Sequence, residues 1–466
     1  MSSFPRADSP LDPSDLRARI TGAIVLPGDG DWDGARSAWN LAVDQHPAMV
    51  ALPESAADVA AVVSHAVEAG LRVAMQGTGH GAGARGGRLP GTILVKTERM
   101  RGIEIDAAAR AARVEAGVLS AEVAAAAGEH GLAMLAGSSP DVGVVGYTLG
   151  GGLSWLGRRY GLAASSVLAV EIVTADGRIR RIDAENDADL FWAVRGGGGS
   201  FGAVTAIELA LFPVAEAYAG MMLWPIERAG EVLHAWREWT ATMPDDMTTV
   251  GRLLQLPPIP AIPEPLRGRA FVAIEAYYLG DEAEGAALVA PIRALGPEID
   301  TVATIPAPAL QRVHMDPEQP VPGRGDGMLL DDLPPSGIDA LVAAAGPGSG
   351  SPLVSLEVRQ LGGALGRPAA GGGALSHVDA EFAVYAVGLA MTPEMGAAAG
   401  AHLAELREAL APWLADTTYL NFAEGDVPGE RLFGPYAHHR LRAVKAAYDL
   451  TDVFRSNHPV IPARSV

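Results

Sequence analysis

Residues 73–83 have the sequence VAMQGTGHGAG, and this stretch decides how the chain is interpreted. Its first four residues are the end of an apolar strand, LRVAMQ (71–76). A loop follows, in which every second residue from Gly77 to Gly83 is glycine. Backbone N–H groups can approach a pyrophosphate closely at glycine, because no Cβ intervenes and φ can be positive. The loop therefore predicts either a phosphate site or a plain turn, and for one such cluster alone the turn is the commoner interpretation.

Two further glycine clusters follow, at 150–152 and at 196–199 with Gly202. The later one formally matches the dinucleotide-binding pattern G-x-G-x-x-G over 197–202. That motif needs a strand before it and a helix after it, whereas here a helical pattern precedes it and the alternating stretch AVTAIELAL follows. We therefore reject a nicotinamide-type Rossmann site, and the lack of G-x-x-x-x-G-K-[ST] removes a P-loop.

The composition describes a folded chain without thiol chemistry. Its 466 residues are 49% hydrophobic and 19% charged, which is too long for one compact core and predicts two domains. A net charge of -20 repels phosphodiester backbones and anionic lipid, so neither nucleic acid nor membrane is expected as a partner. Without cysteine there is no disulfide, thiolate nucleophile, iron–sulfur cluster or cysteine-bound zinc.

The N-terminal region lacks the apolar core and cleavage pattern of a secretory signal, and its first fifteen or so residues predict a loose leader. No apolar stretch approaches the roughly 20 residues of a membrane helix, so we expect a cytoplasmic protein. His438 and His439 are adjacent and cannot both face one metal in regular structure, so no metal site is predicted.

Periodicity predicts alternating helices and short strands up to about residue 212. Ser55 is the expected N-cap of a helix over 56–69, which Gly70 ends. Hairpins are expected within 103–117 and around the Asp176-Gly177 turn. The remaining expected elements are strands at 71–76, 91–97 and 203–211 and helices at 120–130 and 188–194.

Residues 214–415 differ in composition from the preceding part of the chain, because proline-rich loops separate strands with alternating apolar and polar residues. Such alternation at 269–280, 352–363 and 379–390 predicts an antiparallel sheet with one exposed face, and helices such as 394–411 lie between the strands. In the tail, TTYLNF predicts a strand and 438–448 a helix.

The order of these segments resembles the berberine-bridge-enzyme-like branch of the vanillyl-alcohol-oxidase superfamily of flavoproteins, which has a PCMH-type FAD-binding domain. QGTGHGAG (76–83) is similar to the family's Gly-Gly-His loop. AGSSPDVGVVGYTLGGGLSWLGRRYGL (136–162) and DLFWAVRGGGGSFGAVTAIEL (189–209) resemble its second and third flavin-binding stretches. YLNFAEGD (419–426) and RLRAVKAAYDLTDVF (440–454) resemble its C-terminal return into the flavin domain.

The resemblance implies an α+β fold with a two-lobed FAD-binding domain over 16–213, to which 416–466 return. Residues 214–415 would form a substrate-binding domain with an antiparallel sheet covered by helices. It also implies FAD bonded through its 8α-methyl carbon to His80 alone, because many members add a cysteine bond at flavin C6 and Ser139 stands at that position. Some members use a tyrosine as catalytic base where this chain has Phe422, so that base cannot be transferred.

Further cofactor-binding residues follow from the same resemblance, and each has the alternative of being an ordinary turn or core residue. Backbone donors to the phosphates are expected at Gln76, Gly77, Thr78, Gly79 and Gly81. The ribityl chain and the ring are expected beside Val142, Gly143, Gly146 and Tyr147, with close packing at Gly151 and Gly152 and the adenine near Val204.

Candidate catalytic residues come from two stretches. Tyr419 and Asn421 resemble residues that face the flavin ring, and on a strand they would share one face. On 353–360 polar residues lie on both faces, which is unusual where one face packs on a core. The candidates there are Glu357, Arg359 and Gln360, with Tyr385 on a neighbouring strand; a solvated face is the alternative.

The resemblance implies an FAD-linked oxidase that takes a hydride from a small organic metabolite, in secondary metabolism, and passes the electrons to dioxygen. A carbohydrate or alcohol oxidase is the alternative within enzymes, and a dehydrogenase with another electron acceptor stays open. A flavin-binding protein without redox turnover is the alternative of another class. We expect a monomer or a homodimer.

Overall fold

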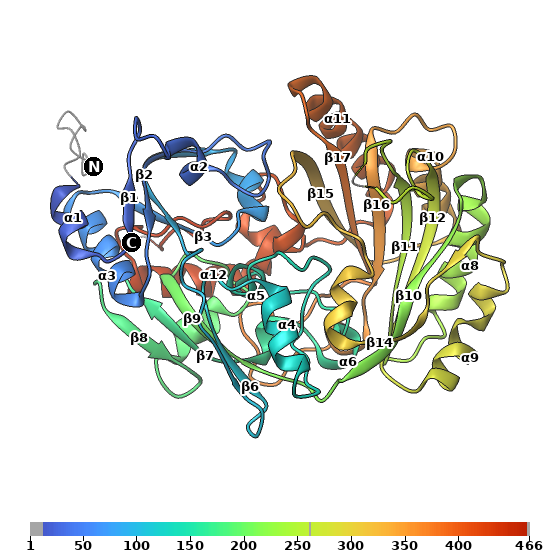
Figure 1. Cartoon of the computed structure of the whole chain (residues 1–466), viewed down its shortest axis with the longest axis horizontal. Helices are drawn as coiled ribbons and strands as arrows, with labels where there is room; N and C mark the ends of the chain where they lie inside the picture. The colour runs from blue at the N-terminus through green and yellow to red at the C-terminus, as the bar shows by residue number, and fades with distance from the viewer. Residues whose placement is uncertain (1–12, 261, 464–466) are drawn as a thin grey trace.

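The computed structural model describes residues 13–260 and 262–463, and it has two lobes (Figure 1). One lobe contains a four-stranded and a five-stranded sheet, and we call it the two-sheet lobe; the other is built on an eight-stranded sheet, and we call it the large-sheet lobe. The predicted α+β class is confirmed, with strands and helices in both lobes. The expected leader lies mostly outside the described residues, but Ser14–Arg19 form helix α1 where a loose segment was predicted.

The four-stranded sheet carries the residues that lead into the first glycine loop. Its order is β1-β2-β4-β3, with β2, β4 and β3 parallel and β1 antiparallel at the edge. The Ser55 hydroxyl caps helix α3 by accepting the N–H of Asp58, which confirms the predicted helix start. The elements are β1 (Ala23–Val25), α2 (Trp32–Arg36), β2 (His46–Leu52), α3 (Ala56–Glu68), β3 (Arg72–Gln76) and β4 (Arg88–Lys96).

The five-stranded sheet is antiparallel throughout, in the order β5-β6-β9-β7-β8. Both predicted hairpins are present, β5 with β6 and β7 with β8. Its strands are β5 (Ile103–Asp106), β6 (Ala111–Glu115), β7 (Val167–Val173), β8 (Ile179–Ile182) and β9 (Ala203–Ala210). The helices of this part are α4 (Ser120–Gly128), α5 (Val144–Leu149), α6 (Gly157–Tyr160) and α7 (Ala188–Val194).

The large sheet is also antiparallel, in the order β13-β10-β12-β11-β16-β17-β15, with β14 beside β10. Helices α8 to α11 cover its outer face (Figure 1). The strands are β10 (Glu216–Pro225), β11 (Met247–Gln255), β12 (Ala270–Tyr278), β13 (Ile299–Asp300), β14 (Ala303–Pro306), β15 (Gly323–Leu330), β16 (Leu353–Gln360) and β17 (Phe382–Leu389). The helices are α8 (Ala229–Thr240), α9 (Glu282–Arg293), α10 (Pro335–Ala345) and α11 (Pro393–Ala409).

The prediction that one face of this sheet is exposed is wrong. Along β11 and β12 almost every residue is buried, so both faces are covered. The outer face packs on the helices through an apolar cluster that includes Trp236 and Phe382, and the inner face turns toward the two-sheet lobe. Polar residues on that inner face are therefore shielded from water and need partners within the protein.

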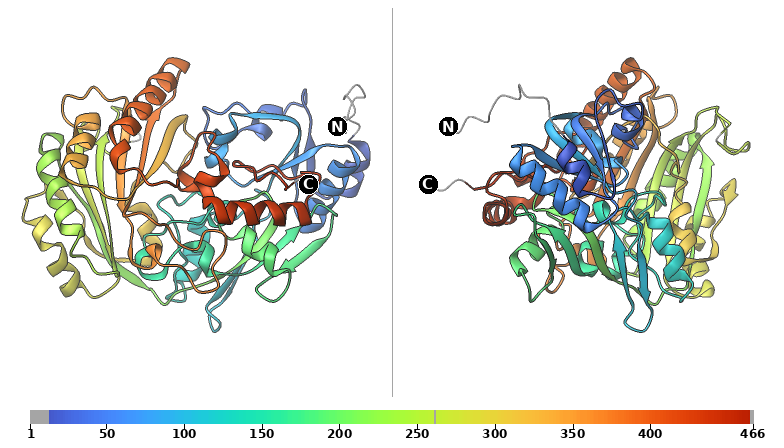
Figure 2. Two further views of the ribbon diagram at one scale, coloured as in Figure 1. Left: turned by 180° about the vertical axis from the view of Figure 1, so that it is seen from behind. Right: turned by 60° about the vertical axis from the view of Figure 1, so that its left-hand side comes forward.

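The C-terminal return runs back onto the two-sheet lobe, where helix α12 (Gly429–Tyr448) lies along its surface (Figure 2). Phe454 then pairs with Val73 of β3 in a parallel bridge. The predicted helix begins nine residues earlier than expected, with an interruption at Gly434, whose φ is 71°. The predicted strand at TTYLNF is wrong, because Leu420–Phe422 form a 3₁₀ turn.

Short 3₁₀ segments complete the secondary structure: η1 (His80–Arg85), η2 (Ala163–Ser166), η3 (Ile226–Arg228), η4 (Ala307–Arg312), η5 (Gly363–Gly366), η6 (Ala411–Trp413) and η7 (Leu420–Phe422). None of the helices in 13–260 and 262–463 has both the length and the apolar character needed to cross a bilayer.

Candidate cofactor and active site

The three glycine clusters meet at one cavity of about 150 Å³ in the two-sheet lobe. Its fourth wall is the C-terminal return, so segments from four distant parts of the sequence enclose it. The lining residues are Met75, Gln76, Gly77, Thr97, Ala116, Val145, Gly146, Leu149, Gly150, Gly198, Gly199, Gly202, Val204, Leu420, Asn421, Arg455, Ser456, Asn457 and His458.

The cavity glycines leave room that a side chain would fill. A Cβ at Gly146 would meet no atom within 4 Å, and at Gly198 and Gly199 the nearest protein atoms would be 3.7 and 3.8 Å away. Open backbone of this kind suits an anionic, extended ligand held by N–H donors, and Arg455 adds a cation to the same wall. The residues present therefore fit the pyrophosphate-bearing cofactor FAD.

Gly151 and Gly152 have a different role from the open glycines. Both have positive φ, 114° and 76°, and a Cβ on Gly152 would lie 2.7 Å from the ring of Tyr147. A Cβ on Gly151 would lie 3.2 Å from the ring of Tyr419. These glycines let two tyrosine rings pack against the backbone. Close packing of the flavin at the same two glycines stays a prediction.

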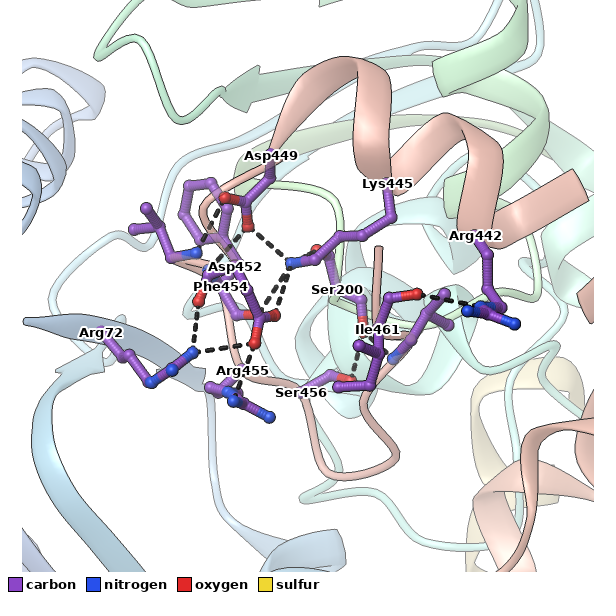
Figure 3. Close-up of polar contacts among 12 residues, drawn as sticks. Arg72, Ser200, Arg442, Lys445, Asp449, Asp452, Phe454, Arg455, Ser456 and Ile461 are labelled. Carbon is purple, nitrogen blue, oxygen red and sulfur yellow. Dashed lines mark hydrogen bonds and ion pairs between the residues drawn. The ribbon is translucent and has the colours of Figure 1, made fainter. Parts of the chain in front are cut away.

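A buried lysine fastens the C-terminal wall to the third glycine cluster (Figure 3). The ammonium of Lys445 is fully buried and pairs with Asp449 at 2.5 Å and with Asp452 at 3.4 Å. It also donates to the carbonyl oxygens of Ser200 at 2.6 Å and Phe454 at 3.0 Å. We call Lys445, Asp449 and Asp452 the lysine clasp; it fixes the chain immediately before the cavity residues 455–458.

The same wall contacts the first glycine loop directly. The Asn457 side chain donates from Nδ2 to the carbonyl oxygen of Gly81 at 2.6 Å. A Cβ on Gly81 would lie 2.8 Å from that nitrogen. The C-terminal segment therefore packs on the backbone next to His80 only because residue 81 is glycine.

His80 begins η1 with its side chain about one-fifth exposed, and three residues surround the imidazole. The Trp39 indole stacks on it, with ring centroids 4.0 Å apart and planes 18° apart. The Thr78 hydroxyl lies 2.7 Å from Nδ1, and Asp141 Oδ1 lies 3.5 Å from Nε2. Asp141 Oδ2 accepts the Trp39 indole N–H at 2.5 Å. The histidine is held in a defined orientation at the edge of the loop.

Tyr419 and Asn421 come together although they do not lie on a strand. Asn421 Nδ2 donates to the Tyr419 hydroxyl at 3.1 Å and to the carbonyl oxygen of Tyr147 at 2.9 Å. The Tyr419 hydroxyl also accepts the N–H of Leu153 at 3.0 Å. Burial raises the pKa of Tyr419, although these hydrogen bonds oppose the rise. The pair connects the cavity to the second glycine stretch.

The inner face of the large sheet carries a buried charge network. Arg252 on β11, Glu275 on β12, and Glu357 and Arg359 on β16 all face inward, and His314 lies over them. His314 Nδ1 is 2.8 Å from Glu275, and Nε2 is 2.5 Å from Glu357. Arg359 pairs with Glu357 at 2.8 Å, and Arg252 pairs with Glu275 at 2.9 Å. We call these five residues the charge network.

Opposite charges keep every carboxylate of the network ionised. Burial opposes charge on Glu357, yet Arg359 and His314 hold its pKa well below the ordinary value. Burial likewise opposes ionisation of Glu275, but His314 and Arg252 lower its pKa to about 2. Burial and Arg252 act to lower the pKa of His314, and the surrounding carboxylates raise it to about 9. Glu357 is therefore a fixed anion and a poor proton acceptor near neutral pH.

The carboxyl group of Glu424, unlike those of the charge network, has a raised pKa. Tyr385 is paired in register with Glu357, and its hydroxyl donates to Glu424 at 2.5 Å. Burial raises the pKa of Glu424, although the hydrogen bonds from Tyr385 and from the N–H of Gly325 oppose the rise. Glu424 also borders the first loop, since a Cβ on Gly83 would lie 3.5 Å from its Oε2. It is a carboxyl group poised for proton exchange between the loop and the sheet.

Aromatic rings separate the charge network from the two-sheet lobe. The Arg359 guanidinium lies 4.6 Å from the Trp155 ring centroid and 5.1 Å from that of Phe422, and it donates to Ser138 Oγ at 3.2 Å. Trp155 stacks on Tyr277 at 4.4 Å. Arg359 therefore presents a cation between aromatic faces where the two lobes meet.

The structure brings most of the predicted site residues to two places. Gln76, Gly77, Gly146, Val204 and Asn421 line the cavity, and Gly143 borders it, since a Cβ there would lie 4.0 Å from Gly77. The residues beside them in the chain are Thr78, Gly79, His80 and Gly81 in the first loop and Ser139, Val142, Tyr147, Gly151 and Gly152 in the second stretch.

Gln360 is not brought to the inner face. Its side chain donates to the carbonyl oxygen of Thr240 at 2.8 Å and accepts from the Thr249 hydroxyl at 3.1 Å, on the helix-covered face of the sheet. Successive side chains of a strand alternate between faces, so Gln360 cannot join Glu357 and Arg359. The structure places this candidate in a polar contact beneath α8.

Sequence reasoning missed Trp39, Asp141, His314, Glu424 and the lysine clasp. Glu424 and Asp141 lie in stretches that were singled out, and each is an acidic residue amid small or apolar neighbours. That signal could have marked these two residues. His314 and Trp39 lie in segments without a motif, and only the tertiary structure brings them to the site.

Two family models match the chain. The model described as FAD binding domain covers residues 47–183, and the model described as berberine and berberine like covers residues 418–461. The first match contains the first loop with His80 and the second glycine cluster, and the second match contains the C-terminal wall.

Curated relatives align over part of their length. (R)-6-hydroxynicotine oxidase of Paenarthrobacter nicotinovorans is 34% identical over 44% of this chain and 45% of its own. Glucooligosaccharide oxidase of Sarocladium strictum is 33% identical over 47% of this chain and 44% of its own. The chain thus aligns with slightly less than half the length of these relatives.

Solved structures align over almost the whole chain. Physcomitrella patens BBE-like 1 superposes with a TM-score of 0.85 at 20% identity, over 97% of this chain and 100% of that one. 6-Hydroxy-D-nicotine oxidase from Arthrobacter nicotinovorans superposes with a TM-score of 0.81 at 26% identity, over 95% and 98%. The domain matches thus identify an FAD binding domain and a berberine-like C-terminal segment in this chain, and the superpositions show that it shares the fold of these flavoproteins.

Proposed function

We propose that this protein is an FAD-linked oxidase that carries its flavin covalently on His80 and oxidises a small organic metabolite. The observation that carries the proposal is the arrangement of one cavity and one sheet face. The glycine-lined cavity and the His80 loop lie in the two-sheet lobe, and Glu424 borders both that loop and Tyr385 of the large sheet. We assign residues 16–213 and 416–466 to cofactor binding and 214–415 to substrate binding.

When bound, FAD supplies a two-electron acceptor for a hydride from a substrate C–H bond, and dioxygen is the proposed final acceptor. The chain's own residues must take the accompanying O–H or N–H proton. Phe422 cannot do so, and Glu357 is held as a fixed anion by Arg359 and His314. We propose that the Tyr385–Glu424 pair accepts this proton from the substrate, because a raised pKa makes a carboxylate a better proton acceptor.

The remaining inner-face residues orient the substrate. Arg359 offers a guanidinium between Trp155 and Phe422, which suits a planar or apolar molecule with a hydrogen-bond acceptor. Tyr419 and Asn421 hold each other and the backbone of Tyr147, so they would fix the position of the ring system at the cavity mouth. The network excludes water from this face because its members are almost fully buried.

A carbohydrate is the second candidate substrate class. Glucooligosaccharide oxidase and a carbohydrate oxidase of Microdochium nivale are 33% and 32% identical to this chain over the aligned parts. A sugar would need several hydrogen-bonding partners, whereas the charged groups of the inner face pair with one another and aromatic rings flank Arg359. We therefore place the apolar metabolite first.

Acid precipitation of the purified protein tests the cofactor and its linkage together. Yellow colour should remain in the pellet of the native protein, whereas His80→Ala should release its flavin to the supernatant. Anaerobic bleaching near 450 nm by a panel of metabolites and sugars, followed by oxygen consumption, then tests turnover. A colourless protein would contradict the cofactor, and a yellow protein that no compound reduces would favour a binding protein without redox turnover.

A further inference from the structure

Asp141 lies against His80 in a geometry that the proposed redox reaction does not use. Its Oδ2 accepts the Trp39 indole N–H at 2.5 Å, and its Oδ1 is directed at His80 Nε2 at 3.5 Å. Oδ1 has no hydrogen-bond partner within the described chain, and neither has Nε2. The Asp141 side chain is 16% exposed and that of His80 22%, so these two atoms face each other in a largely dry site.

The other nitrogen of the ring has a different neighbour. His80 Nδ1 lies 2.7 Å from the Thr78 hydroxyl, which can donate to an unprotonated nitrogen. A carboxylate near Nε2 favours the tautomer that carries its proton there, and this leaves the lone pair on Nδ1. Trp39 stacks on the imidazole and anchors the carboxylate at once, so it fixes both partners of this contact.

We propose that Asp141 is the positioning residue for covalent attachment of the flavin, holding the proton of His80 on Nε2 and accepting it as Nδ1 forms the bond. This inference rests on the proposed linkage through His80. Burial opposes ionisation of Asp141, but the contacts with His80 and Trp39 keep its pKa below the ordinary value, so the group is an anion at neutral pH.

Attachment makes and breaks bonds in His80 and the flavin, and dioxygen is the final electron acceptor. A bond forms between His80 Nδ1 and the 8α-methyl carbon, while one C–H bond of that methyl group and the Nε2–H bond break. Two electrons and two protons pass to the isoalloxazine, one of the protons by way of Asp141. Dioxygen then takes up these two electrons and two protons as hydrogen peroxide, which returns the attached flavin to its oxidised form. The Thr78 hydroxyl contacts the attacking nitrogen but takes no part in the transfer, and it must rotate away before the bond forms.

Attachment can be followed without any substrate. Protein from riboflavin-limited cells is incubated with excess FAD in air, and acid-stable flavin in the pellet is measured over time. Asp141→Asn keeps the size of the side chain and removes its charge, so we expect attachment to slow by about tenfold or more. Asp141→Glu should attach faster than Asp141→Asn, because it retains a carboxylate. Trp39→Phe, which keeps a ring but loses the indole N–H, should fall between the native protein and Asp141→Asn.

The controls separate positioning from binding. Asp106→Asn, at the exposed end of β5, should attach at the native rate within about twofold, because its carboxylate is used locally, accepting the N–H of Ala109 in the turn that follows. His80→Ala gives the level of acid-labile binding, and FAD affinity is measured for each variant by quenching of flavin fluorescence. Native attachment rates in Asp141→Asn would overturn the inference, and so would weakened FAD binding in that variant that accounts for the whole effect.

The same experiment distinguishes two kinds of failure. If the native protein binds FAD but never becomes acid-stable, the proposed linkage through His80 fails before any Asp141 variant is compared. If the native protein attaches flavin and Asp141→Asn does so equally fast, only the role of Asp141 fails.

Discussion

The cavity of the two-sheet lobe and the inner face of the large sheet are built on opposite physical principles. Glycines make up six of the nineteen residues that line the cavity, and the lining comes from distant parts of the chain. The sheet face consists of buried charges on adjacent strands, where Arg252, Glu357 and Tyr385 follow one another in register. Backbone recognition suits a cofactor that never changes, whereas side chains on a rigid sheet can be exchanged without altering the fold.

The two regions also differ in what stabilises them. Each buried carboxylate of the charge network has a cationic partner within the sheet or the loop over it. The C-terminal wall of the cavity is held by contacts with distant segments, among them the lysine clasp, which connects α12 to the third glycine cluster. Substitutions should therefore damage the first region through chemistry and the second through folding.

Removing the clasp should have the largest effect. Lys445→Met leaves the buried Asp449 carboxylate without its cation, whereas Asp452 keeps its arginine partners, and breaking a buried ion pair costs about 3–5 kcal/mol. We expect a large loss of unfolding free energy in urea and loss of bound flavin. Arg442→Met on the same helix is the control, since its guanidinium donates to the carbonyl oxygen of Ile461 in an exposed contact and takes no part in the clasp, and its effect should stay within about 0.5 kcal/mol. Equal stability of the two variants would show that the cavity does not need the clasp.

The next largest effect is expected on turnover, when the Tyr385–Glu424 pair loses its carboxylate. Glu424→Gln should lower kcat by about 10²–10⁴-fold with flavin content unchanged. In the native protein kcat/KM should rise with pH through the raised pKa of Glu424, because the base must be ionised, and that rising limb should be absent in the variant. Glu394→Gln, at the exposed start of α11, is the matched control. A native pH profile in Glu424→Gln would assign the proton to another group.

The charge network should make stability depend on pH. The pKa of His314 is raised to about 9, so the folded protein binds this proton more tightly than the unfolded chain. Its contribution is complete below about pH 6.5 and is lost as the pH rises toward 9, by about 1–3 kcal/mol. Unfolding in urea at several pH values should show this decline in the native protein and a flatter curve in His314→Gln. His46→Gln, at the exposed first residue of β2, should keep the native slope; parallel curves for both variants would refute the network's role.

The smallest effect is expected from a substitution that fills part of the cavity. Gly146→Ala places a methyl group where the protein has no atom within 4 Å, so the flavin-free fold should gain up to about 1 kcal/mol from the alanine in α5. FAD should nevertheless bind about tenfold more weakly, because the methyl group enters its space. The affinity is measured in the His80→Ala background. Gly34→Ala is the matched control, an exposed glycine inside α2 with equally open space, and it should leave FAD affinity unchanged.

Local sequence predicted most elements of the fold. Ser55 marked the start of α3, and the Asp176-Gly177 turn marked the β7–β8 hairpin, because caps and tight turns are encoded by neighbouring residues. TTYLNF failed as a strand because alternation over six residues does not distinguish a strand from a turn held by distant partners. Tyr419 and Asn421 still meet, since the 3₁₀ turn also brings them together.

The site was predictable only where a motif carried it. The glycine clusters predicted the cavity walls, because a missing side chain is visible in the sequence. Asp141 could not be linked to Trp39, 102 residues away, and Glu424 lies 39 residues from Tyr385. The first pair forms within the two-sheet lobe and the second forms between the lobes, and neither leaves a pattern along the chain. The burial of both sheet faces was missed for the same reason.

The position of residues 455–458 in the cavity wall has a consequence for biosynthesis. Every glycine cluster is synthesised before this wall, so we expect the growing polypeptide to retain the cofactor only once residues 455–458 have been added. A translation product truncated before these residues should be colourless even if its first strands have folded.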